Sequence, residues 1–422
     1  MRTSVAVALA VLAAVPAALV HFGVLSGLPV PVTTLFFGLA IVGASFAMAW
    51  GAEAAEHDIP RALALTVVAL LAVFPEYAVD IVFAFKAGQD PAYAPYAAAN
   101  MTGSNRLLLG LGWPTIAVLA WISRGQRSLR LARDSIMPLF FLAVATVYSF
   151  ILPVKAHIGL VDTVILIALF GAYAVLAARE DTEEPDLIGP SQTIGALPKN
   201  RRRLAILGLF AFAGLTIGAS ATPFAEGLVH TGAALGIDEF LLVQWLAPLA
   251  SEAPEFLVAA LLAWRGKSSA ALGLMLSAKL NQWTLLVGSL PLAYSVGVAT
   301  LPESSSLLAA LTSTLPLDAR QVSEVGLTAA QSLFGVAVLA SLSLELGEAA
   351  LLAVLFLGQF VLGGVLRASL HNTGGADQEL VVFSIVYLLL SLVFVFRARK
   401  TVSALLQRRR RSRGVRAAPS QR

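Results

Sequence analysis

Four carboxylates lie within two long apolar runs of the sequence, two in each run: Glu76, Asp80, Glu252 and Glu255. Within each pair the residues are three or four positions apart, so a helix would carry both on one face. Carboxylate oxygens are hard ligands that suit Ca²⁺, Na⁺ or protons rather than soft metals. We therefore expect these four side chains to form a site for a hard cation.

A proline directly precedes one acid of each pair, Pro75 before Glu76 and Pro254 before Glu255. Proline lacks an N–H group and clashes with the carbonyl one turn earlier, so both helices should be kinked or locally unwound. Carbonyls released at membrane depth are tolerated where they line a polar cavity. The two prolines therefore predict helix breaks at the cation site.

The composition excludes a water-soluble globular protein. Of the 422 residues, 58% are apolar and 13% are charged, with a mean hydropathy of +0.81, whereas a soluble domain carries roughly 25% charged residues. The absence of cysteine excludes disulfides, thiolate zinc sites and iron–sulfur clusters. The net charge of +4 does not indicate a nucleic-acid partner, because ten Lys and Arg residues lie in the C-terminal segment 397–422.

Apolar runs of about 20 residues recur along the whole chain, and each is long enough to cross a ~30 Å hydrocarbon core as a helix. This pattern predicts an all-α polytopic membrane protein in contact with lipid. We expect about twelve transmembrane helices, at 4–22, 32–54, 61–86, 93–122, 135–152, 157–178, 204–224, 237–264, 268–299, 326–344, 348–366 and 378–396.

Basic residues predict the orientation. With the N-terminus inside, the inside segments hold 23 of the 29 Lys and Arg residues, as the positive-inside rule requires. We therefore expect a protein of the plasma (inner) membrane with both termini cytoplasmic. The first span also resembles a secretory signal, whose cleavage would leave eleven spans and keep every later segment on the same side.

The two Pro-Glu segments indicate an inverted repeat. When the two segments are aligned at an offset of 179 residues, Lys86 aligns with Arg265 and Asn100 aligns with Lys279. The first segment lies in the third span and the second in the eighth, which runs in the opposite direction. Secondary transporters often have such repeats, with substrate sites where two interrupted helices meet near the midplane.

This symmetry divides the chain into a core of five plus five helices with one further helix at each end. The expected parts are an N-terminal helix or signal-like segment, a first membrane repeat, a cytoplasmic linker, a second inverted repeat, and a last helix with a basic tail, at 1–31, 32–178, 179–203, 204–369 and 370–422.

The segment ANMTGSN, from Ala99 to Asn105, follows the first Pro-Glu helix. Together they resemble the repeat of the sodium/calcium exchanger (Ca²⁺/cation antiporter) superfamily, whose repeats read G-[ST]-S-x-P-E and then G-N-x-x-G-S-N. The resemblance implies that Glu76 and Glu255 ligate Ca²⁺ or Na⁺. It also implies that Asn100 completes the site, with Asn105 in the same motif and with Ser251 at the hydroxyl position of the second repeat.

Several positions depart from that pattern. Residues 71–73 read Leu-Ala-Val, so the hydroxyls that would bind Na⁺ are absent from the first repeat. In the second repeat Glu252 replaces a hydroxyl, and Lys279 stands where a ligand would be, with Asn281 out of register nearby. These departures argue against a site for three Na⁺ and one Ca²⁺.

Lys279 and Arg106 are the two basic residues inside predicted spans. We hypothesise that Lys279 neutralises Glu252 or Glu255 when no ion is bound and deprotonates when a cation arrives. Alternatively it is a permanent cation in a salt bridge, which would abolish one ion site. Arg106 is expected to be a structural counter-ion. The six charges at membrane depth have a formal balance of −2, which one divalent cation or two monovalent cations could neutralise.

The sequence thus predicts a secondary active antiporter that needs no cofactor and exchanges Ca²⁺ or a monovalent cation for H⁺ or Na⁺. One alternative is a carrier of the same fold for a non-cation or organic solute, with Lys279 and Arg106 as fixed cations. A second is an intramembrane enzyme, for which no nucleophile or metal set is found. The sequence contains no phosphate-binding loop of the kind that an ATP-driven pump would need.

Overall fold

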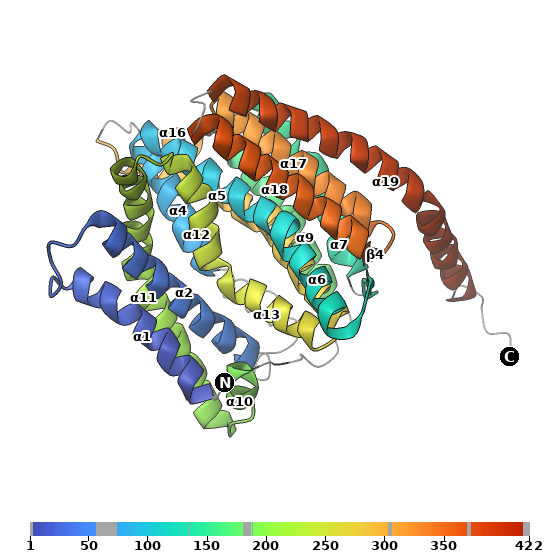
Figure 1. Ribbon diagram of the computed structural model, residues 1–422, viewed down its shortest axis with the longest axis horizontal. Helices are drawn as coiled ribbons and strands as arrows, with labels where there is room; N and C mark the ends of the chain where they lie inside the picture. Colours follow the sequence, from blue (N-terminus) through green and yellow to red (C-terminus); the bar gives the residue numbers. More distant parts are fainter. Residues whose placement is uncertain are drawn as a thin grey trace.

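Helices make up most of the computed structural model, which describes residues 3–55, 74–133, 135–179, 187, 189–302, 306–368 and 373–416 (Figure 1). The first half contains α1 (Thr3–His21), α2 (Val30–Ala55), α4 (Phe74–Gln89), η1 (Pro91–Tyr93), α5 (Ala94–Leu107), the π-helical η2 (Leu108–Gly112), α6 (Trp113–Arg124), α7 (Ile136–Ser149), α8 (Ile151–Lys155) and α9 (Leu160–Ala177). The second half contains α10 (Pro190–Gly195), α11 (Lys199–Leu235), α12 (Glu239–Ser251), α13 (Ala253–Trp264), α14 (Ser268–Asn281), the π-helical η3 (Gln282–Leu286), α15 (Val287–Ala299), α16 (Leu307–Leu311), α17 (Ala319–Leu339), α18 (Leu346–Ala368) and α19 (Thr373–Arg416).

Within the described ranges, nine helices are long and apolar enough to cross a membrane, or ten if the bent pair α12 and α13 forms one span. The predicted all-α membrane fold is confirmed. The predicted count of twelve is not. The third predicted span, 61–86, is described only from Phe74 onward, and the ninth, 268–299, contains a polar stretch around η3 that lowers its hydropathy.

Two short antiparallel sheets reveal the inverted repeat. Strand β1 (Ser128–Arg130) pairs with β4 (Ser343–Glu345), and β2 (His157–Ile158) pairs with β3 (Leu315–Pro316). In each half the first strand precedes a long helix and the second strand follows it. Each sheet therefore joins the first strand of one repeat to the second strand of the other, which is the pairing expected of two repeats related by a two-fold axis.

The ends of two equivalent helices are capped in the same way. Asp162 Oδ2 accepts a hydrogen bond from the Gly159 N–H at 2.7 Å, at the start of α9. Glu348 Oε2 accepts one from the Glu345 N–H at 2.9 Å, at the start of α18. A carboxylate here satisfies an N–H group that the helix leaves unpaired. Lys155 also forms an ion pair with Asp162. The two halves thus share their capping chemistry as well as their topology.

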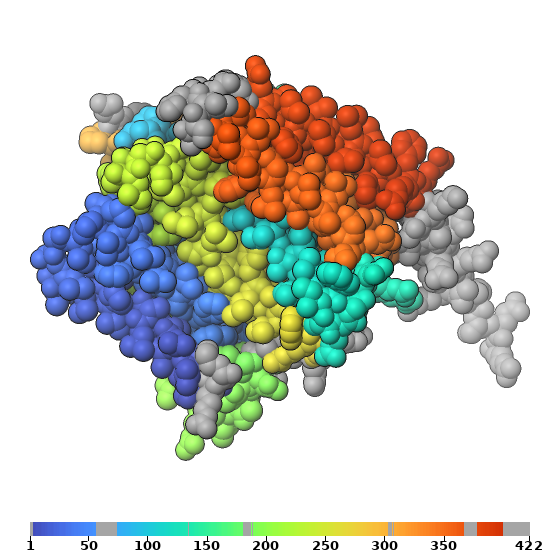
Figure 2. All heavy atoms as spheres, viewed as in Figure 1, coloured from blue at the N-terminus to red at the C-terminus, as the bar shows by residue number. Residues whose placement is uncertain are grey.

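Helices α1, α2 and α11 lie side by side, apart from the C-terminal helices α17 to α19 (Figure 1). A hydrogen bond of 3.0 Å between the hydroxyls of Thr34 and Thr231 joins α2 to α11. An ion pair between Lys86 and Glu226 joins α11 to α4. In the space-filling view, α12 and α13 (yellow) lie at the surface between the N-terminal and the C-terminal helices (Figure 2). They occupy the boundary at which the two sets of helices meet.

Glycines allow α4 and α15 to cross closely. A Cβ atom on Gly297 would lie 2.0 Å from the Phe85 carbonyl oxygen, and one on Gly88 would lie 2.2 Å from the Tyr294 carbonyl oxygen. Real Cβ atoms essentially never approach backbone so closely, so a side chain here would push the helices apart. Small residues commonly permit such approaches between membrane helices.

Gly297→Ala should therefore destabilise the protein by about 1–3 kcal/mol, the usual cost of overpacking. The measurement is thermal unfolding of the purified protein in detergent. The matched control is Gly218→Ala in α11, where a Cβ would meet no atom within 4 Å, and which should leave the melting temperature unchanged or slightly higher. Equal melting temperatures for the two variants would contradict the close crossing.

Candidate functional site

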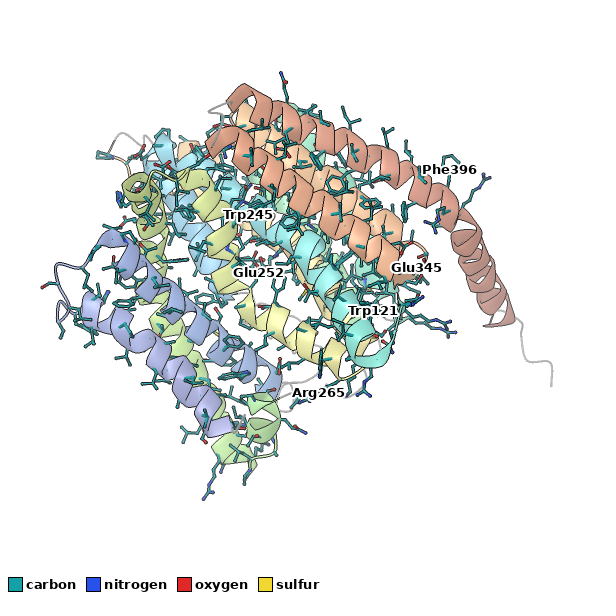
Figure 3. The ribbon with its side chains drawn as sticks, viewed as in Figure 1. Trp121, Trp245, Glu252, Arg265, Glu345 and Phe396 are labelled. Carbon is teal, nitrogen blue, oxygen red and sulfur yellow. The ribbon has the colours of Figure 1, made fainter. Side chains whose placement is uncertain are left out.

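The chain breaks at the second Pro-Glu segment. Helices α12 and α13 meet at an angle of 58°, and Glu252 stands between them with φ −93° and ψ 0°. Pro254 occupies the first turn of α13, where its missing N–H costs no hydrogen bond. Figure 3 shows Glu252 near the centre of the molecule, at this bend. The helix break predicted at Pro254 is thus observed. Residues 56–73 lie outside the described ranges, so the break predicted at Pro75 stays a prediction.

An amide joins carboxylates from the two repeats. Gln282 Nε2, in η3, donates to Glu76 Oε1 at 3.1 Å and to Glu252 Oε1 at 2.8 Å. Both glutamates are at least 96% buried, and Ser104 lies beside them. The structure therefore brings together two of the acids that the sequence singled out, through a residue that sequence reasoning missed. A polar Asn-Gln pair inside an apolar run was the available signal.

Asp80 and Asn100 are fully buried beside each other, on α4 and α5. Within the described ranges, neither side chain makes a hydrogen bond of ordinary geometry, so both carboxylate oxygens and both amide atoms have no partner there. The large majority of buried side-chain polar atoms in proteins do have a partner. This pair therefore offers oxygen ligands that no donor among the described residues occupies.

Glu255 lies in the first turn of α13, where the exposed N–H groups of the helix favour a negative charge. It is partly exposed, unlike Glu76, and its Oε2 atom is buried without a hydrogen-bond partner. Its carboxylate is close enough to Glu76 and to Glu53 of α2 to interact with their charges. Glu255 thus extends the acidic region from the buried centre toward α2.

Lys279 does not pair with the acids as predicted. Its Nζ donates to the Asn105 carbonyl oxygen at 2.7 Å and to Asn105 Oδ1 at 2.8 Å. Among the described residues, no carboxylate lies within 4.0 Å of Nζ. The expected salt bridge to Glu252 or Glu255 is therefore not seen among the described residues, and Glu252 instead accepts a hydrogen bond from the Gln282 amide.

Arg106 is paired with a carboxylate that the sequence did not single out. Its Nη1 atom lies 2.8 Å from Glu324 Oε2, and both side chains are at least 97% buried. Gln244 Nε2 donates to the same carboxylate oxygen at 3.1 Å, and the Trp245 ring lies 4.9 Å from the guanidinium carbon. Glu324 was missed because we placed the start of its span at residue 326, whereas α17 begins at Ala319.

Two further predicted ligands, Asn281 and Ser251, are engaged in hydrogen bonds within the protein. Tyr77 donates its hydroxyl to Asn281 Oδ1 at 3.0 Å, which ties α4 to the second repeat. The Ser251 hydroxyl donates to the Ala247 carbonyl one turn back in α12, at 3.2 Å. Within the part of the chain that the structure describes, no three His, Asp or Glu side chains are placed to hold a metal ion by themselves.

The Arg106 pair predicts a strong effect on stability. Glu324→Gln should cost about 3–5 kcal/mol, because it leaves the guanidinium charge buried and unpaired. Replacing both partners, as Arg106→Met with Glu324→Leu, should recover much of this loss. The control Glu226→Gln, which breaks the more exposed pair with Lys86, should cost about 1 kcal/mol or less. Thermal unfolding in detergent measures all three, and a loss below that of the control would contradict a buried ion pair.

Comparisons with known proteins agree on the family. The family model described as "sodium/calcium exchanger protein" matches residues 30–179 and 205–363. A crystal structure of the H⁺/Ca²⁺ exchanger CAX is 39% identical to this chain, with a TM-score of 0.86, and the match covers 98% of this chain and 99% of that one. None of the curated proteins matches this sequence.

More distant structures share the fold. Native YfkE is 15% identical with a TM-score of 0.57, covering 92% of this chain and 99% of that one. The sodium–calcium exchanger NCX_Mj is 16% identical with a TM-score of 0.52, covering 79% and 98%. The family model matches both halves of the chain. The broken α12–α13 helix and the pairing of the two sheets agree with that match. The chain therefore belongs to the sodium/calcium exchanger family.

Proposed function

We propose that this membrane protein is a secondary antiporter that exchanges Ca²⁺ for H⁺ by alternating access. Its membership of the exchanger family supports a cation antiporter, and the similar protein of 39% identity is described as an H⁺/Ca²⁺ exchanger. In this proposal Glu76, Asp80, Glu252 and Glu255 bind either the cation or protons. In this proposal the protein lies in the plasma membrane, and the distribution of Lys and Arg among its loops supports an orientation with both termini cytoplasmic.

The observation that carries the proposal is the single amide of Gln282 shared by Glu76 and Glu252. An amide donates hydrogen bonds without neutralising charge, so two ionised carboxylates that share one amide nitrogen as a donor repel each other. Either a proton or a cation relieves that repulsion. Because each excludes the other from the same oxygens, binding of Ca²⁺ releases protons, which is the thermodynamic basis of exchange.

The available ligands favour Ca²⁺ over Na⁺. Asp80 and Asn100 supply buried oxygens without partners, and Ca²⁺ takes six to eight oxygen ligands from carboxylates, amides and carbonyls. Residues 71–73 lack the hydroxyls that would bind Na⁺ in the first repeat. In this proposal the site is formed by oxygens from both repeats, and more of its ligands are carboxylates than hydroxyls. Such a negatively charged site suits a divalent ion.

No observation favours a carrier for an organic anion. Such a carrier would need Arg106 and Lys279 as free cations, yet Arg106 is paired with Glu324 and Lys279 donates to Asn105. Both groups are also fully buried or nearly so. A cation therefore fits the acidic site better than an anion fits these two residues.

Transport in proteoliposomes tests the proposal. An imposed Ca²⁺ gradient should drive proton movement in the opposite direction, whereas Na⁺ and K⁺ gradients should not. Glu76→Gln and Glu255→Gln should each lower Ca²⁺ affinity by about 100-fold, since each removes a charged ligand. Glu226→Gln, far from these acids in the pair with Lys86, is the matched control and should transport normally. Sodium-driven Ca²⁺ flux without proton movement would replace H⁺ by Na⁺ as the coupling ion.

Acid should weaken Ca²⁺ binding if protons compete for the same oxygens. Where two protons are displaced by each Ca²⁺, the apparent Kd rises about 100-fold for each unit of pH below the titration range of the site. Thermal stabilisation by Ca²⁺ at several pH values measures this slope. An affinity that does not change with pH would contradict competition, even if Ca²⁺ itself still binds.

A further inference from the structure

Lys279 is a buried ammonium among oxygen atoms rather than beside a carboxylate. Its side chain is fully buried on α14, and its two hydrogen bonds go to the carbonyl and the amide oxygen of Asn105. Carbonyl and amide oxygens of interrupted membrane helices are also typical ligands of Na⁺. The Lys279 Nζ therefore occupies a position that suits a small monovalent cation.

The surrounding charges fit this interpretation. Glu252 and Glu76 are close enough to attract the ammonium, while Arg106 repels it. None of these groups touches it, because the Gln282 amide binds the two glutamates and Glu324 binds the guanidinium. The ammonium thus adds positive charge beside the acids without covering their oxygens, as an ion in a neighbouring site would.

The repeat symmetry shows what Lys279 replaces. At the offset of the two Pro-Glu segments, Lys279 is the counterpart of Asn100. Asn100 lies beside Asp80 with both amide atoms unpartnered. One repeat therefore presents a neutral ligand at this position, whereas the other presents a covalently attached cation, which makes the two halves of the site unequal.

We propose that Lys279 permanently takes the place of a monovalent cation bound at Asn105, so that the protein keeps its divalent site and loses a second ion site. This inference rests on the proposed function only in naming the ion at the remaining site. It makes Lys279 a residue that sets ion specificity and stoichiometry. It also predicts that removing the side chain creates a monovalent cation site at the Asn105 oxygens.

The test uses two substitutions of the full chain. Lys279→Ala leaves a cavity, so Na⁺, K⁺ or ethylammonium should raise its melting temperature in a concentration-dependent way, as ligand binding does. Lys279→Met fills most of the volume without a charge, so it should be destabilised and should not respond. The parent protein should not respond either. Choline at equal concentration is the control for ionic strength.

Transport provides a second readout if a variant is too unstable for thermal measurement. Ca²⁺ transport by Lys279→Ala should depend on Na⁺, K⁺ or ethylammonium, whereas transport by the parent should not. The inference is overturned if no monovalent cation stabilises Lys279→Ala beyond choline or restores its transport. It is also overturned if Lys279→Met is as stable and active as the parent.

Failure of the proposed function gives a different result. In that case the parent shows no Ca²⁺-driven proton movement, while the thermal response of Lys279→Ala to monovalent cations is unaffected. If Lys279 instead carries the exchanged proton, Lys279→Ala loses proton movement while monovalent cations neither stabilise it nor restore its transport. That outcome contradicts a tethered cation.

Discussion

The structure depends on how carboxylates are held inside an apolar helical bundle. A charge in such a region needs a counter-charge or strong donors, since the medium does not solvate it. Glu324 has a counter-charge in Arg106, which makes it a structural residue. Among the described residues, neither Glu76 nor Glu252 forms an ion pair; both accept from the shared amide of Gln282, with Ser104 beside them. In the proposed function, this difference separates an ion pair that stabilises the bundle from acids whose charge is left for a transported ion.

The two-fold scaffold carries a site that is not symmetrical. The paired sheets and the caps at Asp162 and Glu348 repeat the same chemistry in both halves, and such features fix the positions of the helices. Near the centre the halves differ, since Asn100 has Lys279 as its counterpart. A symmetrical frame supports alternating access, because the same movement can open either side, whereas unequal ligands can set which ions bind.

Sequence patterns predicted the elements better than their contacts. Apolar runs and Pro254 predicted the spans and the break at Glu252, since both depend on local chemistry. The partners of Lys279 and Arg106 could not be predicted, because hydropathy gives the depth of a residue but not which neighbouring helix it faces. Glu324 was excluded by a span boundary placed a few residues late, and Gln282 was overlooked because an uncharged amide does not stand out in a search for charges.

The central claim is that Ca²⁺ and protons compete for oxygens contributed by both repeats. Calorimetric titration with Ca²⁺ in buffers of different ionisation enthalpy measures the number of protons released for each ion bound. The account predicts about two protons per Ca²⁺ at a pH where the site is protonated, and fewer in Glu76→Gln. Binding of Ca²⁺ with no proton release at any pH would contradict it.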